Sequence, residues 1–116
     1  MKAIVTATAL VLVVASQAKA ESGLDYAKRN AALYLALNKM CGVDERAWLT
    51  FAQAYVLKIV NDTGADPQAV QMAAVNLIST EAIKIEIQIT KSGHKDELCE
   101  KGNQGAKDIL AGKLPR

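Results

Sequence analysis

Apolar residues recur at helical spacing in four segments of the chain, and glycines separate the segments. The first segment runs from about Leu24 to Cys41 and is rich in alanine, a strong helix former. Gly42 follows it directly, which is the usual place for a residue that ends a helix. We therefore expect the first helix to occupy this segment.

The second segment has the clearest amphipathic pattern. Asp44 is a good N-cap residue and Gly64 follows the last apolar position, so a helix of about four turns is expected between them. One stripe of this helix carries most of its large apolar residues, and the polar residues lie off it. The stripe consists of Trp48, Leu49, Ala52, Tyr55, Val56, Ile59 and Val60.

The third segment opens with Asp66 and Pro67, a cap followed by a proline suited to the first helical position. Two faces of the expected helix are apolar, which is more than a peripheral helix needs. The main face holds Val70, Ala74, Leu77, Ile78, Ala82, Ile85 and Ile89, and the second face holds Met72, Ile83 and Ile87.

Residues 83–89 alternate strictly between apolar and polar positions, as a half-buried strand does. A strand needs a partner, and no other segment of the chain has a strand pattern. We therefore favour a continuous helix. A strand that pairs across a dimer is the alternative.

The fourth segment extends from about Asp96 to Ala111. Gly102 lies on its apolar stripe, where the missing side chain permits the close approach of another helix at a cost in helix propensity. Four helices with short connections predict an all-α fold, a small antiparallel four-helix bundle.

Residues 1–20 have the anatomy of a secretory signal peptide. Lys2 precedes an apolar stretch of about twelve residues, and Ala18-Lys19-Ala20 offers small residues for cleavage after Ala20. That stretch is shorter than the roughly 20 residues of a transmembrane helix. We expect a signal peptide at 1–20, a helical domain at 21–116, a periplasmic or secreted location, and no stable membrane insertion after cleavage.

Charge and length narrow the possible functions. The chain of 116 residues has fourteen Lys and Arg and twelve Asp and Glu. Lys2 and Lys19 lie in the predicted signal peptide, so the mature chain is neutral. A neutral chain with few aromatic residues does not indicate nucleic-acid binding. The length suits one domain and excludes multidomain enzymes.

Cys41 and Cys99 both lie in the predicted mature chain. Paired cysteines in an exported protein usually form a disulfide, and only one intramolecular pairing is available here. The bond would join the end of the first helix to the start of the fourth. The single histidine, His94, leaves too few ligands for a zinc site, and we expect neither a metal nor a cofactor.

Catalytic constellations are scarce, and we expect no enzymatic activity. His94 lies in a polar turn, and the nucleotide-binding glycine motifs are absent. A carboxylate-dependent hydrolase is an unfavoured alternative. Its acids would be Glu81 with Glu86, or the cluster Asp96, Glu97 and Glu100.

Protein contact is the function that the sequence favours. In layout the chain is similar to small two-cysteine helical periplasmic proteins, which include acid-stress chaperones and immunity proteins of secreted toxins, although it carries no residue motif of either group. We expect an inhibitor, immunity protein or accessory factor that binds another protein or a second copy of itself. The candidate contact residues lie off the main stripes: Phe51, Leu57, Met72, Ile83 and Ile87.

A small apolar ligand held inside the bundle is the alternative binding function. The aromatic residues offered for such a pocket are Tyr26, Tyr34, Trp48 and Tyr55.

Overall fold

The computed structural model describes residues 23–113, all of whose regular structure is helical. The predicted signal peptide at 1–20 lies outside the described residues. The helices are α2 (Gly23–Cys41), α3 (Glu45–Thr63), α4 (Pro67–Ser92) and α5 (Lys95–Leu110). The all-α prediction is confirmed, and residues 83–89 continue α4 as a helix. The finer expectation of antiparallel packing stays a prediction.

Local capping chemistry sets the helix boundaries where the sequence predicted them. The Asp44 side chain accepts a hydrogen bond of 2.9 Å from the backbone N–H of Arg46 at the start of α3. The Asp66 side chain does the same for Ala69 at the start of α4, at 2.9 Å. Gly64 ends α3 with a φ of 71°, a left-handed conformation that glycine adopts without strain.

Asp44 also pairs with the guanidinium of Arg46, whose Nη2 lies 2.7 Å from Oδ2. The hydrogen bonds from the Arg46 side chain and backbone lower the pKa of Asp44 to about 2. The cap is therefore ionised at neutral pH, which suits its place at the positive end of the α3 dipole.

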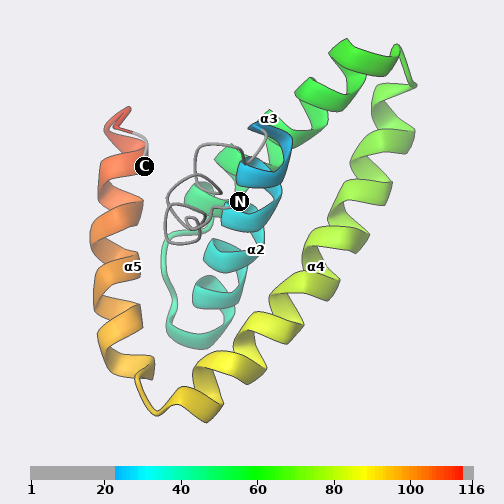
Figure 1. Cartoon of the computed structure of the whole chain (residues 1–116). Helices are drawn as coiled ribbons and strands as arrows, with labels where there is room; N and C mark the ends of the chain where they lie inside the picture. The colour runs from blue at the N-terminus through cyan, green and yellow to red at the C-terminus, as the bar shows by residue number, and fades with distance from the viewer. Residues whose placement is uncertain (1–22, 114–116) are drawn as a thin grey trace, which may run out of the picture.

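Helix α2 occupies the centre of the fold and contacts each of the other three helices (Figure 1). Four of its six buried residues are alanines that are at most 5% exposed, so neighbouring helices approach its backbone closely. These residues are Ala27, Ala31, Ala32 and Ala36. Helices α3 and α4 pack on α2, and their connected ends project beyond it as an arm (Figure 1).

Phe51 corrects one prediction made from the sequence. It was expected on a partner-facing surface, but it is 3% exposed and belongs to the core. Its ring stacks on Tyr34 and meets Tyr26 edge-on, with both centroid distances at 5.9 Å. The buried side of α3 therefore does not coincide with its predicted apolar stripe. It is turned toward α2, which supplies both tyrosines.

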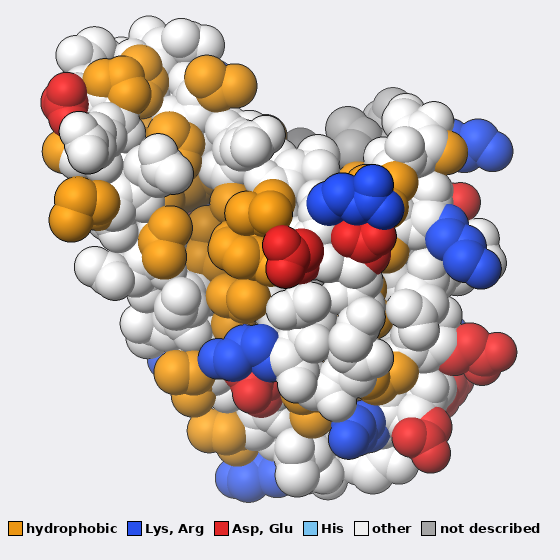
Figure 2. All heavy atoms as spheres, turned by 180° about the vertical axis from the view of Figure 1, so that it is seen from behind, with side chains coloured by type: hydrophobic (Ala, Val, Ile, Leu, Met, Phe, Trp, Pro, Cys, Tyr) orange, Lys and Arg blue, Asp and Glu red, His pale blue; other side chains and the backbone are white. Residues whose placement is uncertain are grey.

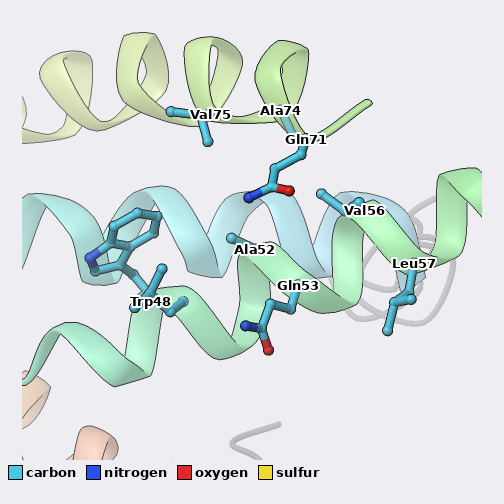
Figure 3. Close-up of a pocket in the computed structure, with 9 residues that line it drawn as sticks. Trp48, Ala52, Gln53, Val56, Leu57, Gln71, Ala74 and Val75 are labelled. Carbon is cyan, nitrogen blue, oxygen red and sulfur yellow. The ribbon is translucent and has the colours of Figure 1, made fainter. Parts of the chain in front are cut away.

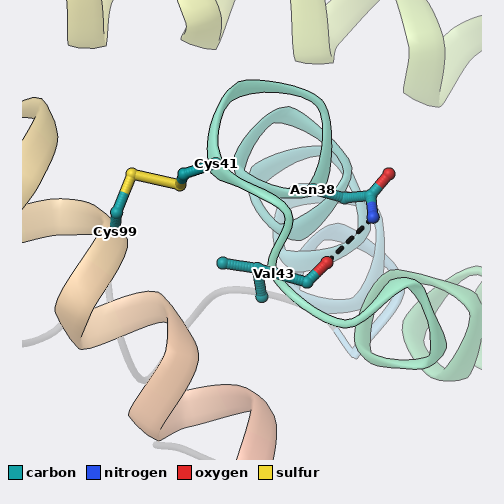
Figure 4. The surroundings of a disulfide bond; sticks show 4 residues. All are labelled: Asn38, Cys41, Val43 and Cys99. Atoms are coloured by element: carbon teal, nitrogen blue, oxygen red, sulfur yellow. Dashed lines mark hydrogen bonds between the residues drawn. A yellow bond between two sulfur atoms is a disulfide. The ribbon is translucent and has the colours of Figure 1, made fainter.

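The predicted disulfide is present between Cys41, the last residue of α2, and Cys99 in α5 (Figure 4). The two Cα atoms lie 6.2 Å apart, and 58 positions separate the residues in sequence. Beside the bond, Asn38 donates a 2.8 Å hydrogen bond to the carbonyl of the fully buried Val43. The disulfide therefore ties α5 to the connection that leads from α2 into α3.

Gly102 provides the close approach expected of it. A Cβ atom at this position would lie 2.6 Å from Cδ1 of Leu37, which is itself 3% exposed in the core. The backbone of α5 thus rests directly on α2, and the side chain of Leu37 has little room to move away.

Removal of the disulfide by the paired substitutions Cys41→Ser and Cys99→Ser should lower the free energy of unfolding by about 4 kcal/mol. The loss arises because the unfolded chain is no longer closed into a long loop. Urea unfolding followed by circular dichroism measures the change. Wild type in reductant is the matched control and should unfold with the paired variant. An unchanged unfolding midpoint would contradict the stabilising role.

Substitution Gly102→Ala should destabilise the protein by about 1 kcal/mol, because the overpacking cost of about 2 kcal/mol exceeds the helix-propensity gain of about 1 kcal/mol. The control is Asn103→Ala, an exposed neighbour on α5 where a propensity gain of about 0.6 kcal/mol meets no clash. Thermal unfolding of both variants separates the effects. Stabilisation by Gly102→Ala as well as by Asn103→Ala would show that α5 does not rest closely on α2.

Candidate functional site

A groove of about 350 Å³ lies between α3 and α4. Helix α2 runs behind both helices, so the groove opens on the side that α2 leaves uncovered (Figure 3). Hydrophobic side chains gather in a hollow beside the projecting arm on this face (Figure 2). The groove residues are Trp48, Leu49, Ala52, Gln53, Val56 and Leu57 of α3 with Gln71, Ala74 and Val75 of α4.

The groove follows from the rotation of α3. Phe51 and Tyr55 turn toward the core, so the other edge of the apolar stripe is left beside α4 without full cover. Leu49 and Val56 on that edge are only partly buried. Trp48 and Leu57 lie toward opposite ends of the groove (Figure 3), and Leu57 is 61% exposed.

The groove has no charged side chain among its nine residues. Its polar groups are the amides of Gln53 and Gln71, which can donate and accept hydrogen bonds without a charge. On the α4 side, residues 67–80 form a run without a single Lys, Arg, Asp, Glu or His. Such a surface suits an uncharged, apolar occupant and offers no group for acid–base chemistry.

Three of the predicted contact residues lie elsewhere on α4. Met72 is 66% exposed, and Ile83 and Ile87 are each 51% exposed. They do not belong to the groove, which holds Leu57 alone of the predicted contact residues. The structure thus separates the predicted contact set into a groove residue, an outer surface of α4, and the buried Phe51.

Sequence reasoning missed most of the α4 side of the groove, notably Gln71 and Val75. Both are exposed, and neither stood out as an apolar stripe position at the surface. The charge-free run 67–80 is the signal that could have identified them, because an exposed helix of a monomeric protein normally carries charges.

Two of the candidate catalytic carboxylates are held in ion pairs. Glu81 lies 3.4 Å from Lys84 near the surface, and pairs of this kind contribute little to stability. Glu86 is partly buried and lies 3.5 Å from Lys39 across the α2–α4 contact, and its Oε2 is buried without a hydrogen bond from any described residue. A shallow hollow beside Glu81 also holds Asp25, Lys28 and Arg29 of α2, which sequence reasoning did not bring together with it.

The second acidic cluster lies along one side of α5. Asp96, Glu97 and Glu100 line a shallow surface hollow together with lysines, and Glu97 pairs with Lys101 at 3.5 Å. His94 Nδ1 lies 3.7 Å from the same carboxylate. Within residues 23–113 no group of His, Cys, Asp and Glu side chains is arranged to hold a metal ion.

The aromatic residues expected around a small ligand are divided between the core and the groove. Tyr34 and Tyr55 are buried in the core, where Tyr34 stacks on Phe51. Burial raises the pKa of Tyr34, with smaller contributions from Tyr26 and Asp108. Trp48 alone of the four lines the groove. An internal pocket at the tyrosines is therefore filled by the protein itself.

The chain matches no known family model, no curated protein and no solved structure. Among residues 23–113, no helix has the length and apolar character needed to cross a membrane.

Proposed function

We propose that this chain is an exported protein-binding module that acts by contact, as an inhibitor, an immunity protein or an accessory or chaperone factor. The observation that carries the proposal is the uncharged apolar groove between α3 and α4. The apolar face of a helix from a partner protein is the occupant that such a groove suits, because helix-in-groove recognition relies on apolar anchors.

Export is part of the proposal. The signal peptide is inferred at 1–20, and a mature chain that begins at Glu21 keeps all four described helices. The Cys41–Cys99 disulfide is compatible with an oxidising compartment such as the periplasm. The bundle is taken as antiparallel, the arrangement that short connections favour in four-helix proteins.

The dimensions of the groove also support the proposal. Trp48 and Leu57 lie toward its two ends, with Ala52 between them, so a partner side chain can approach the α3 backbone at the centre. Aromatic anchors such as Trp48 are typical of residues that contribute most to binding. The glutamine amides at the rim supply hydrogen bonds that fix the register of the occupant.

A small apolar ligand in the same groove is the second candidate function. The groove volume lies within the range of ligand sites, about 300–1,000 Å³. This ligand would contact Trp48 and the aliphatic groove residues, not the buried tyrosines.

The substitutions Leu57→Glu and Val75→Glu should abolish partner binding with at least a tenfold loss of affinity, because each places a charge in the desolvated contact. Both residues are exposed, so the fold should survive, as circular dichroism will show. Leu110→Glu, an exposed leucine of α5 outside the groove, is the matched control and should bind normally. The mature chain is immobilised and incubated with periplasmic extract, and bound proteins are quantified by mass spectrometry.

The proposal is supported by a protein that wild type and the Leu110→Glu variant retain and that both groove variants lose. Retention by all four chains would place the contact outside the groove, and the absence of any specifically retained protein would contradict the proposal. Native mass spectrometry of the purified chain distinguishes the second candidate. A retained small molecule that the groove variants lack would favour ligand binding.

A further inference from the structure

Two covalent connections hold the N-terminal end of α5, which lies at one edge of the fold (Figure 1). The backbone reaches α5 from α4 through Gly93 and His94, and the disulfide at Cys99 ties the start of α5 to the end of α2 (Figure 4). Gly93 has a φ of 75°, and His94 gives the helix no side-chain hydrogen bond as a cap. Without the disulfide, the remaining connection is therefore a glycine hinge and an uncapped helix end.

Beyond the disulfide, the packing of α5 depends on small residues. Its buried residues are Gly102, Ala106 and Ile109, of which Ile109 alone has a large side chain. Burial of large apolar side chains supplies most of the free energy that docks a helix, so α5 gains little from its own packing. Seven of its 16 residues are charged, so a released α5 is readily solvated.

Helix α5 covers a buried apolar surface of α2 and of the connection that follows it. A Cβ atom at Gly102 would lie 2.6 Å from Cδ1 of Leu37 and 3.5 Å from Cγ2 of Val43, and both side chains are at most 3% exposed. The hydroxyl of Tyr34 occupies the place where a Cβ atom at Gly105 would lie. Leu37, Val43 and Tyr34 are thus the part of the core that α5 shields from water.

We propose that the Cys41–Cys99 disulfide is a redox latch: its reduction releases α5 from the surface of Leu37, Val43 and Tyr34, while α2, α3 and α4 stay packed together. Both cysteines are partly exposed, so a reductant can reach the sulfur atoms, and accessible disulfides are the ones that are reduced readily.

The three other helices have a core of their own. Phe51, Tyr55 and the fully buried Ile78 belong to α3 and α4, and these helices pack on α2 more extensively than α5 does. Local unfolding of one weakly packed element is the expected opening of such a structure. No residue of α5 lines the α3–α4 groove, so the latch does not depend on the function proposed for the groove.

Reduction of the latch is a thiol–disulfide exchange with a dithiol. A thiolate of the dithiol attacks one sulfur of the disulfide, the S–S bond breaks, and the other cysteine leaves as a thiolate that takes up a proton. The second thiol of the dithiol attacks the mixed disulfide and releases the first cysteine. The protein thereby gains two electrons and two protons, and the dithiol becomes a disulfide.

A released α5 also loses its helical structure. An isolated helix of this length is marginal in water, and Gly102 and Gly105 lower its propensity further. Undocking and unfolding of α5 therefore occur together, which makes the release visible in the exchange of its backbone amides.

The test is hydrogen–deuterium exchange of the mature chain, measured by mass spectrometry before and after reduction with dithiothreitol. Reduction should speed amide exchange in residues 95–110 at least about tenfold, because the hydrogen bonds of α5 open when it undocks. Exchange in α3 and α4 should change less than about twofold. Reoxidation should return the protection of α5.

Each other outcome contradicts the latch. Faster exchange to the same extent in all four helices would show that the disulfide holds the whole fold and not α5 alone. Unchanged exchange in residues 95–110 would show that α5 stays docked without the bond. Protection that does not return on reoxidation would rule out a reversible device.

The paired substitutions Cys41→Ser and Cys99→Ser provide the first control. This variant should resemble reduced wild type and should not respond to dithiothreitol, because the chain has only these two cysteines. A response to dithiothreitol in this variant would show that the reductant acts elsewhere.

Ile109→Ala separates the disulfide from the packing of α5. It should open α5 further in the reduced chain but leave α5 docked in the oxidised chain. Leu110→Ala, at the exposed next position, is the matched control and should behave as wild type in both states. An oxidised Ile109→Ala chain with α5 as open as in reduced wild type would show that packing, and not the disulfide, is the latch.

Discussion

The packing of small alanine side chains on α2 is the constraint on which the fold depends. Ala27, Ala31, Ala32 and Ala36 let other helices approach the α2 backbone closely, and α2 packs more extensively than any other described helix. The larger side chains of this part of the core come from both helices, since Phe51 of α3 packs against Tyr26 and Tyr34 of α2. This ring contact sets the rotation of α3 about its own axis.

The groove is a consequence of that rotation. When Phe51 and Tyr55 face the core, Leu49 and Val56 line the groove beside α4. Helix α2 covers only one side of the α3–α4 pair, so the opposite side is open to solvent (Figure 3). Larger side chains in place of the alanines of α2 would push α3 and α4 to other positions. The exposed apolar edge of α3 therefore depends on the small side chains of α2.

Helix α5 is held in another way. It packs less extensively against the other helices than α2, α3 and α4 pack against one another. Two features compensate for this: the direct contact of Gly102 with Leu37 and the covalent bond from Cys99 to Cys41. The disulfide closes a long loop of chain and thereby disfavours the unfolded state, which matters most for a helix with a small packing surface.

Local patterns were enough to predict the helices and the cysteine pair. Asp44 and Asp66 satisfy free N–H groups within three residues of themselves, and Gly64 adopts its left-handed conformation at the next position, so short sequence windows contain the relevant physics. The pairing of Cys41 with Cys99 followed from there being two cysteines. The exposure of Met72, Ile83 and Ile87 also followed from helical periodicity, because the opposite face was already occupied by core residues.

The direction in which each apolar residue points was decided by the tertiary structure alone. Phe51 lies off the centre of its apolar stripe, yet the two tyrosines of α2 bury it. Gln71 and Val75 are groove residues because the fold places this part of α4 across the groove from α3. Helical periodicity identifies which residues share a face, but burial depends on where neighbouring helices lie. That position is set by contacts between residues far apart in the chain.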